Sequence, residues 1–248
     1  MIWQACHGPR HVGPVSGVLY RLVESQEQIA TLGYVDTLEE QAVLESLIDA
    51  VKPPYPEDGT GFHYLLKTPF RYPPLPWGSR FGRTHEPGIF YGGCGIGTTL
   101  AESAYYRFVF WHSMDAPPPK AQINSQHTLF SVGYKTGQGI RLQSPPFDAY
   151  RAELAHPADY QAAQQVGTAM REAGVQAFEY FSARDPKGGC CVGLFTLHAL
   201  AQKRPRDMSP WLCQASGEEI AFKQAGGHEV ATYAIASFLH EGRLPVPA

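Results

Sequence analysis

Two segments of the chain carry apolar side chains at the spacing of an α-helix. In residues 36–52, leucine, isoleucine and valine recur at near-helical intervals. Asp36 and Glu39 have the spacing of a capping box and Pro53 follows the last turn, so we expect the helix to begin and end there. A second helix is expected over residues 158–173, with an inner side formed by Ala162, Val166, Ala169, Met170 and Ala173.

A third helix is expected from Thr98 or Thr99 to residue 113. Its sequence, TTLAESAYYRFVFWHS, is apolar over most of the helix circumference, which predicts that it is largely buried. A short apolar strand over residues 88–91 precedes it, and glycines at 92, 93, 95 and 97 separate the two. The predicted order is therefore strand, glycine turn and helix.

Further apolar runs predict strands over residues 127–135, 139–143, 175–184, 189–197 and 218–224, and a last helix over 229–240. Prolines punctuate residues 53–88, so we expect a shaped loop region there rather than a long helix. Strands and helices do not alternate regularly, which favours an α+β fold. Without a repeat or a change in composition, one domain is expected over residues 1–248.

Composition and charge favour a globular protein and argue against several other classes. The 248 residues are 44% hydrophobic and include 25 glycines and 21 prolines, which is typical of a globular, loop-rich protein and makes an all-helical one improbable. The net charge of −3 provides no global field for binding nucleic acid. Five cysteines without a C-x-x-C pair, no membrane span and no signal peptide together indicate a cytoplasmic protein.

Glu102 and the glycine turn before it can each be interpreted as functional or as purely structural. A carboxylate in a nearly charge-free helix is costly to bury unless it is paired or used, yet Thr99 and Glu102 also have the spacing of a capping box. A strand, a glycine turn and a helix N-terminus together favour phosphate binding. Gly93-x-Gly95-x-Gly97 matches no phosphate-binding fingerprint, so the glycines are expected to form a structural turn.

Other polar residues are weak candidates taken singly. Arg80 and Arg83 in GSRFGR can present guanidinium groups to phosphate, but loop arginines are usually solvated. Ser182 and Arg184 follow a strand in YFSARDP, where a serine most often stabilises a turn, and no G-x-S-x-G motif surrounds it. The ten histidines form no metal-binding motif, and we assign no metal.

The order of these motifs is specific even though each is weak. GSRFG around Arg80, GIFYGG with Tyr91, TTLAES with Glu102 and YFSARDP with Ser182 follow one another along the chain. In this order they resemble the RES domain, which is named for its Arg, Glu and Ser and found as the toxin of bacterial toxin–antitoxin pairs. The resemblance extends from about Tyr20-Arg21 to the stretches WLCQASGEEIAF and LPVPA, and so covers most of the chain.

The resemblance implies a core similar to the diphtheria-toxin type of ADP-ribosyltransferase, with a mixed β-sheet and flanking helices. It implies a helical extension over roughly residues 1–60 and a catalytic core over roughly 61–248. NAD is then a substrate that is consumed rather than a bound cofactor. Glu102 stabilises the ribose cation, Ser182 orients Glu102, Tyr91 stacks on nicotinamide, and the arginines that bind NAD are Arg80, Arg83 and Arg184, with Arg80 favoured over Arg83 by its Gly-Ser-Arg-Phe context.

By the same resemblance, the chain is a toxin that transfers ADP-ribose to a protein acceptor, such as phosphoribosyl pyrophosphate synthetase. The close alternative is an NAD glycohydrolase or NAD phosphorylase, and an alternative of another class is a catalytically inactive binding module. The expected partner is a helical antitoxin with an Xre-like or related domain, whose terminal segment enters the pocket and masks the arginine. Direct binding to nucleic acid or membrane is not expected.

Overall fold

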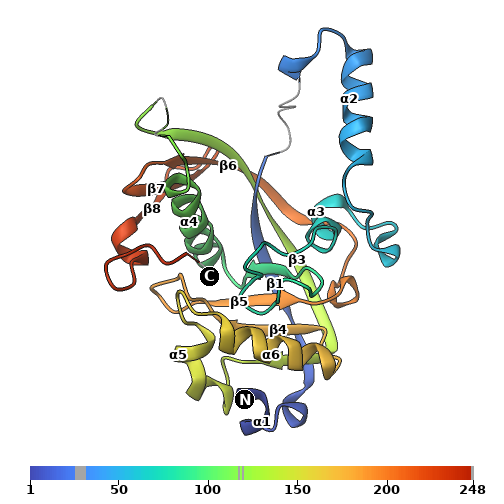
Figure 1. Ribbon diagram of the computed structural model, residues 1–248, viewed down its shortest axis with the longest axis vertical. Coiled ribbons are helices and arrows are strands. Elements are labelled where there is room, and N and C mark those ends of the chain that lie inside the picture. Colours follow the sequence, from blue (N-terminus) through green and yellow to red (C-terminus); the bar gives the residue numbers. More distant parts are fainter. Residues whose placement is uncertain (26–31, 117, 119, 247–248) are drawn as a thin grey trace.

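A mixed sheet organises the computed structural model, which describes residues 1–25, 32–116, 118 and 120–246 (Figure 1). Its eight strands within these residues are β1 (Gly13–Glu24), β2 (Phe90–Gly93), β3 (Ile123–Arg141), β4 (Ala177–Phe181), β5 (Cys190–Leu194), β6 (Arg206–Ala215), β7 (Glu219–Gln224) and β8 (Val230–Ala234). They lie in the order β1-β2-β5-β4-β3-β6-β7-β8. The expected α+β class, with a mixed sheet and flanking helices, is confirmed.

The sheet closes on itself over its first five strands. β1 pairs with β2 at Tyr20 and Gly93, and it also pairs with β3 along nearly its whole length. β3 pairs in parallel with β4, whereas the other pairs of strands are antiparallel. A small barrel therefore forms, and β6, β7 and β8 extend from it along the other end of β3.

The α-helices of the described residues are α1 (Ile2–Ala5), α2 (Leu38–Ala50), α3 (Tyr64–Lys67), α4 (Ile96–His112), α5 (Arg151–Leu154) and α6 (Gln161–Glu172). α4 packs on β6 and β7 through Leu100, Ala104, Tyr105 and Phe108. α6 packs on β4 and β5 through Ala163, Val166 and Met170. None of the helices in the described part of the chain is long and apolar enough to cross a membrane.

Helix α2 projects away from the body of the molecule (Figure 1). It confirms the helix expected over residues 36–52, but its capping box consists of Thr37 and Glu40 rather than Asp36 and Glu39. The Thr37 side chain accepts a hydrogen bond from the Glu40 N–H, because Thr37 is the residue with extended backbone before the first turn. Leu47 on this helix is 61% exposed, so its apolar side remains largely in solvent.

Two expectations about secondary structure are wrong. Residues 127–135 and 139–143 do not form two strands: one strand, β3, runs from Ile123 to Arg141. Gly139 lies within this strand and permits close packing, since a Cβ atom there would lie 2.0 Å from Cγ2 of Val15. The helix expected over residues 229–240 is instead β8, followed by a single 3₁₀ turn.

Strand β1 lies within the segment that was expected to be a helical extension. Residues 13–24 pair with two strands of the barrel, so the first 60 residues are not separate from the sheet. α2 is the part of that segment which does project from the body. The position of β1 matters for function because it places Arg21 beside β2.

Candidate active site

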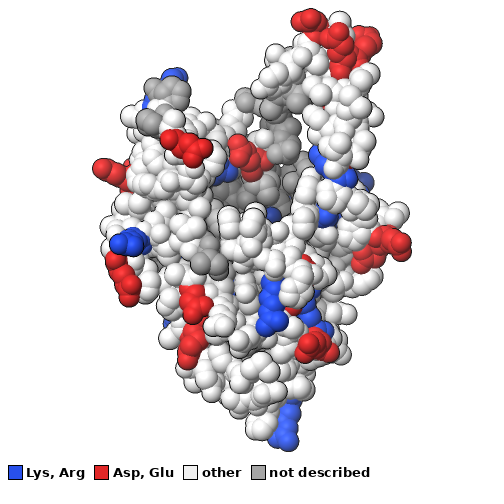
Figure 2. Space-filling view, viewed as in Figure 1, with Lys and Arg blue, Asp and Glu red and all other residues white. Residues whose placement is uncertain are grey.

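A cavity of about 730 Å³ opens beneath the projecting α2 (Figure 2). Residues from β1, the loops between Lys52 and Arg80, β2, α4 and the segments at Tyr160 and Arg184 line it. Its volume falls within the range of roughly 300–1,000 Å³ that is usual for pockets binding small molecules. Most of the residues expected at the site lie together in its wall.

Glu102 lies on α4, half-buried in this wall, and Ser182 holds one of its oxygens. The Ser182 hydroxyl donates to Oε1 of Glu102 over 2.6 Å. The same hydroxyl oxygen accepts hydrogen bonds from the backbone N–H groups of Arg184 and Asp185, at 3.0 and 2.9 Å. On the other side, Cys191 Sγ lies 3.7 Å from the same carboxylate oxygen. Burial, and then the nearby Glu102, raises the pKa of the Cys191 thiol well above its usual value.

The hypothesis that Thr99 and Glu102 form a capping box is wrong. α4 begins at Ile96 with Gly95 as its N-cap, which leaves Thr99 inside the helix. The Thr99 hydroxyl donates to the carbonyl oxygens of Gly95 and Tyr20 instead. Among the preceding glycines, Gly93 permits close approach, because a Cβ atom there would lie 2.5 Å from Thr99 Oγ1.

Arg80 reaches the cavity wall from the loop before β2. Its Nη1 donates to the carbonyl oxygen of His156 over 2.7 Å and to that of Leu154 over 3.5 Å. The guanidinium carbon lies 4.4 Å from the centre of the Tyr160 ring. Nε and Nη2 have no hydrogen-bond acceptor among the described residues, so they are free to bind an anionic ligand.

Arg184 lies on the other side of the same Leu154–Tyr160 segment. Its Nη2 donates to the Pro157 carbonyl over 2.6 Å and to the Tyr160 hydroxyl over 3.2 Å. Its guanidinium lies 3.5 Å from the centre of the Tyr105 ring. Arg83, in contrast, does not line the cavity: its backbone N–H donates to Glu86 in a local turn. The structure thus separates the two arginines of GSRFGR.

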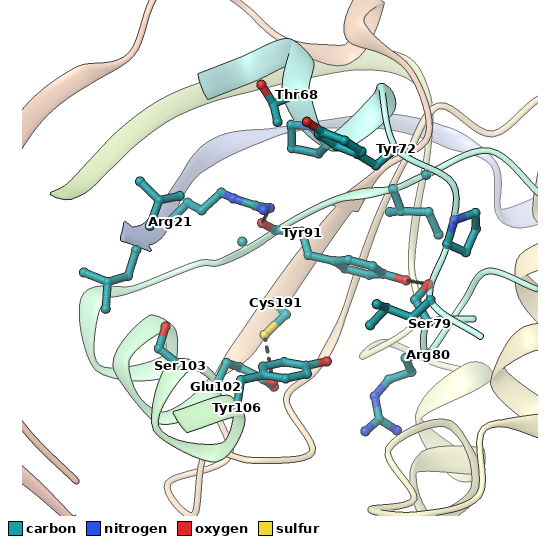
Figure 3. A pocket seen from close by; sticks show the side chains of 18 of the residues that line it. Arg21, Thr68, Tyr72, Ser79, Arg80, Tyr91, Glu102, Ser103, Tyr106 and Cys191 are labelled. Carbon is teal, nitrogen blue, oxygen red and sulfur yellow. Dashed lines mark hydrogen bonds between the residues drawn. The ribbon is translucent and has the colours of Figure 1, made fainter. Parts of the chain in front are cut away.

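Tyr91 is fixed at both its ends. Its hydroxyl accepts a hydrogen bond from the Phe81 N–H and lies 3.0 Å from Ser79 Oγ, while its carbonyl oxygen accepts from Arg21 (Figure 3). Burial raises the pKa of Tyr91 to about 12, so its hydroxyl stays protonated at neutral pH. The ring lines the cavity without hydrogen-bonding Glu102 or Arg80.

Sequence reasoning missed three residues of the cavity wall. Arg21 on β1 donates to Tyr91 over 2.8 Å, and burial lowers its pKa to about 10, which still leaves it charged at neutral pH. Tyr106 lies one helical turn after Glu102, and that four-residue spacing is the signal that places both side chains on one face. No pattern in the sequence pointed to Tyr160.

The charges of the inner cavity favour an anionic ligand. Arg21, Arg80 and Arg184 are hydrogen-bonded to carbonyl or hydroxyl oxygens, and none forms an ion pair among the described residues. The described cavity wall carries two carboxylates: Glu24, which forms an ion pair with Arg107, and Glu102. Uncharged acceptors orient the guanidinium groups without neutralising them. No group of three or more His, Cys, Asp or Glu side chains is placed to hold a metal in the part of the chain described.

Comparison with known proteins shows the family to which this chain belongs. A search of curated proteins gave no match. One solved structure with a similar fold is the MbcT–MbcA toxin–antitoxin complex of M. tuberculosis, with a TM-score of 0.46 and 11% sequence identity over 87% of this chain and 92% of that one. The model of the RES domain matches residues 56–216, more than half of the chain and including Arg80, Tyr91, Glu102 and Ser182. The chain therefore belongs to the RES domain family.

Proposed function

We propose that this protein is the toxin of a bacterial toxin–antitoxin pair that cleaves the nicotinamide glycosidic bond of NAD and transfers ADP-ribose to a protein. The observation that carries the proposal is Glu102, held at 2.6 Å by Ser182 in the same cavity as Arg80. Membership of the RES domain family supports it, since the sequence resemblance implies this chemistry. The resemblance also implies an ADP-ribosyltransferase-like core, and the cysteine usage of the sequence favours a cytoplasmic location.

The reaction breaks the bond between C1′ of the ribose and the ring nitrogen of nicotinamide. The bonding electron pair stays with nicotinamide, which leaves as a neutral ring, and positive charge develops on the ribose. Glu102 would accept a hydrogen bond from a ribose hydroxyl and stabilise that charge, an interaction that strengthens as the bond breaks. The acceptor then attacks C1′ with its own electron pair and loses a proton.

The remaining residues would hold the rest of NAD. Arg80 would bind the pyrophosphate through its open Nε and Nη2 donors, with Arg184 and Arg21 adding positive charge from either side. Tyr91 would present its ring to nicotinamide. Since this site binds a dinucleotide through side chains that are already in place, the wall requires little reorganisation before the bond breaks.

The partner would be an antitoxin with an Xre-like or related domain. Its terminal segment would enter the cavity and cover Arg80, which prevents NAD from binding until the antitoxin is removed. Contact with operator DNA would belong to that partner. The protein acceptor, for which phosphoribosyl pyrophosphate synthetase is the example given by the family resemblance, would approach from the open side of the cavity beneath α2.

A second candidate is NAD hydrolysis or phosphorolysis, with water or phosphate as the acceptor. Glu102 and Ser182 serve bond cleavage in either case. The projecting α2 favours a protein acceptor, because it precedes the family match at residue 56 and supplies additional surface near the cavity. A catalytically inactive binding module would use the same cavity without consuming NAD.

Labelled NAD tests these functions directly. With NAD labelled in its adenylate half, transfer puts the label on protein, whereas hydrolysis or phosphorolysis yields only free ADP-ribose or its phosphate ester. Glu102→Gln should lower the rate of NAD loss by about 100-fold or more and abolish toxicity. The matched control is Glu153→Gln on the exposed α5. Unchanged toxicity of a folded Glu102→Gln protein would show that the site works without catalysis.

A further inference from the structure

We infer that Tyr160 is a positioning residue that aligns the two arginines of the cavity for an anionic nucleotide. One side chain contacts both: its ring face lies 4.4 Å from the Arg80 guanidinium carbon, and its hydroxyl accepts a hydrogen bond from Arg184 Nη2 over 3.2 Å. Tyr160 is itself only 4% exposed, so its ring has little freedom to move. The inference rests on the proposed function for the identity of the nucleotide.

The backbone before Tyr160 completes the arrangement. The carbonyl oxygen of His156 accepts from Arg80, and that of Pro157 accepts from Arg184. This short segment is held in shape by His156 Nδ1, which accepts hydrogen bonds from the N–H groups of Ala158 and Asp159 at 3.3 and 2.8 Å. Arg80 and Arg184 are 104 positions apart in the sequence, and both donate hydrogen bonds to this short segment.

The chemistry of these contacts explains why a tyrosine suits this position. Two guanidinium groups repel each other, and a carboxylate between them would relieve the repulsion but would also neutralise charge that the ligand needs. An aromatic face attracts a cation without carrying a net charge, and a phenol oxygen accepts a hydrogen bond without ionising at neutral pH. Tyr160 therefore supports both cations while their charge remains available to a pyrophosphate.

This role predicts an effect on nucleotide binding rather than on bond cleavage. Arg80 and Arg184 stabilise the pyrophosphate before and during the reaction alike, so losing their alignment should raise KM and leave kcat nearly unchanged. Glu102 is hydrogen-bonded to Ser182, and none of the hydrogen bonds among the described residues joins it to Tyr160. The two parts of the site can therefore be separated by kinetics.

The experiment compares Tyr160→Phe and Tyr160→Leu in the full chain. Tyr160→Leu removes ring and hydroxyl, and should raise KM for NAD and the Kd for ADP-ribose roughly 10-fold, with kcat within about threefold of the unaltered protein. Tyr160→Phe keeps the face beneath Arg80 and loses only the bond from Arg184, so the increase should be about two- to fivefold. ADP-ribose has no nicotinamide bond, so titration calorimetry with it measures binding alone.

Tyr150→Leu provides the control, because Tyr150 packs against the core beside α6 and does not line the cavity. It should lower stability without changing either constant. Unchanged KM and Kd in Tyr160→Leu, or a fall in kcat alone, would overturn the inference. If Tyr160→Leu does not fold, unchanged constants in Tyr160→Phe overturn it equally. If the unaltered protein binds ADP-ribose but does not cleave NAD, the proposed function is refuted. The Kd values of the Tyr160 variants for ADP-ribose would still test the role of Tyr160.

Discussion

The Ser182 hydroxyl donates its hydrogen bond to the Glu102 carboxylate. Its oxygen already accepts hydrogen bonds from two backbone N–H groups, those of Arg184 and Asp185. A hydroxyl has two acceptor lone pairs and a single hydrogen, so the hydrogen must point along the remaining contact, 2.6 Å to Oε1 of Glu102. The backbone after β4 thereby fixes the orientation of a carboxylate on α4.

Ser182→Ala should slow NAD cleavage without preventing it. The change removes a hydrogen bond to a charged group, worth about 1.5–3 kcal/mol, and so should lower kcat by roughly 10- to 100-fold. The loss should be smaller than in Glu102→Gln, since the carboxylate remains. Single-turnover measurements with saturating NAD provide the test.

Ser113→Ala is the matched control for this prediction. The Ser113 hydroxyl donates to the Phe110 carbonyl at the far end of α4, outside the cavity wall. Its rate should equal that of the unaltered protein. Equal rates in Ser182→Ala and Ser113→Ala would show that Glu102 needs no support from Ser182.

Tyr106→Ala should weaken NAD binding while Phe110→Ala does not. Both rings lie on α4 and are similarly exposed, at 52% and 51%, but only Tyr106 lines the described cavity. Stacking of a base on an aromatic ring is worth about 1–3 kcal/mol, so KM should rise at least fivefold. Tyr106→Phe should restore most of the affinity. A KM that changes equally in both alanine variants would contradict a role for Tyr106 in binding.

Substituting alanine for two helical glycines should change the free energy of unfolding in opposite directions. A Cβ atom at Gly167 of α6 would lie 1.9 Å from the Phe81 carbonyl oxygen, next to Arg80, whereas one at Gly97 of α4 would meet nothing within 4 Å. Gly167→Ala should cost about 2 kcal/mol or more of stability through overpacking. Gly97→Ala should add about 0.5 kcal/mol by reducing the entropy of the unfolded chain. Urea unfolding of both variants measures the difference, and stabilisation by Gly167→Ala would show that the contact relaxes freely.

Stability should fall on mild acidification because of His127. Burial lowers the pKa of His127 to about 4, below its ordinary value of 6.5, and the side chain is 2% exposed. Between pH 6.5 and about 4 the unfolded chain binds a proton that the folded chain does not, so stability present above pH 6.5 is lost as the pH falls.

The free energy of unfolding should therefore drop about 2 kcal/mol more between pH 7.5 and pH 5 in the unaltered protein than in His127→Gln, which does not titrate. The exposed His85 supplies the control, and His85→Gln should retain the full pH dependence. Parallel pH profiles for the unaltered protein and His127→Gln would contradict the assignment.

Local patterns predicted the helices and short strands near the site well. Helical periodicity identified the regions of α2, α4 and α6, and motif order identified Glu102, Arg80 and Ser182 as one constellation. Glu102 and Ser182 are hydrogen-bonded to each other, and Arg80 lines the cavity with Glu102. Spacing along one helix is enough to predict the helices, and the order of the motifs along the chain is enough to predict the constellation.

Features that depend on distant pairing were missed. β1 pairs with β3 more than 100 residues away, and nothing in residues 13–24 alone shows which strands will flank them. The last helix was predicted over a segment whose Val230, Thr232 and Tyr233 instead pair with β7. Tyr160 lies immediately before the first residue of α6, at the end of an irregular segment that has no periodic signal in the sequence.

The dual pairing of β1 also determines how far the chain can be shortened. Trimming to the matched residues 56–216 would remove β1, β7 and β8 together, and with β1 the partner of β3 from His127 to Gly139. Unpaired strand edges in the middle of a sheet bind other chains, so the trimmed protein should aggregate rather than persist as a smaller folded domain. Cleavage after residue 55 would likewise leave β1 attached to the barrel only by packing and by its hydrogen bonds to β2 and β3.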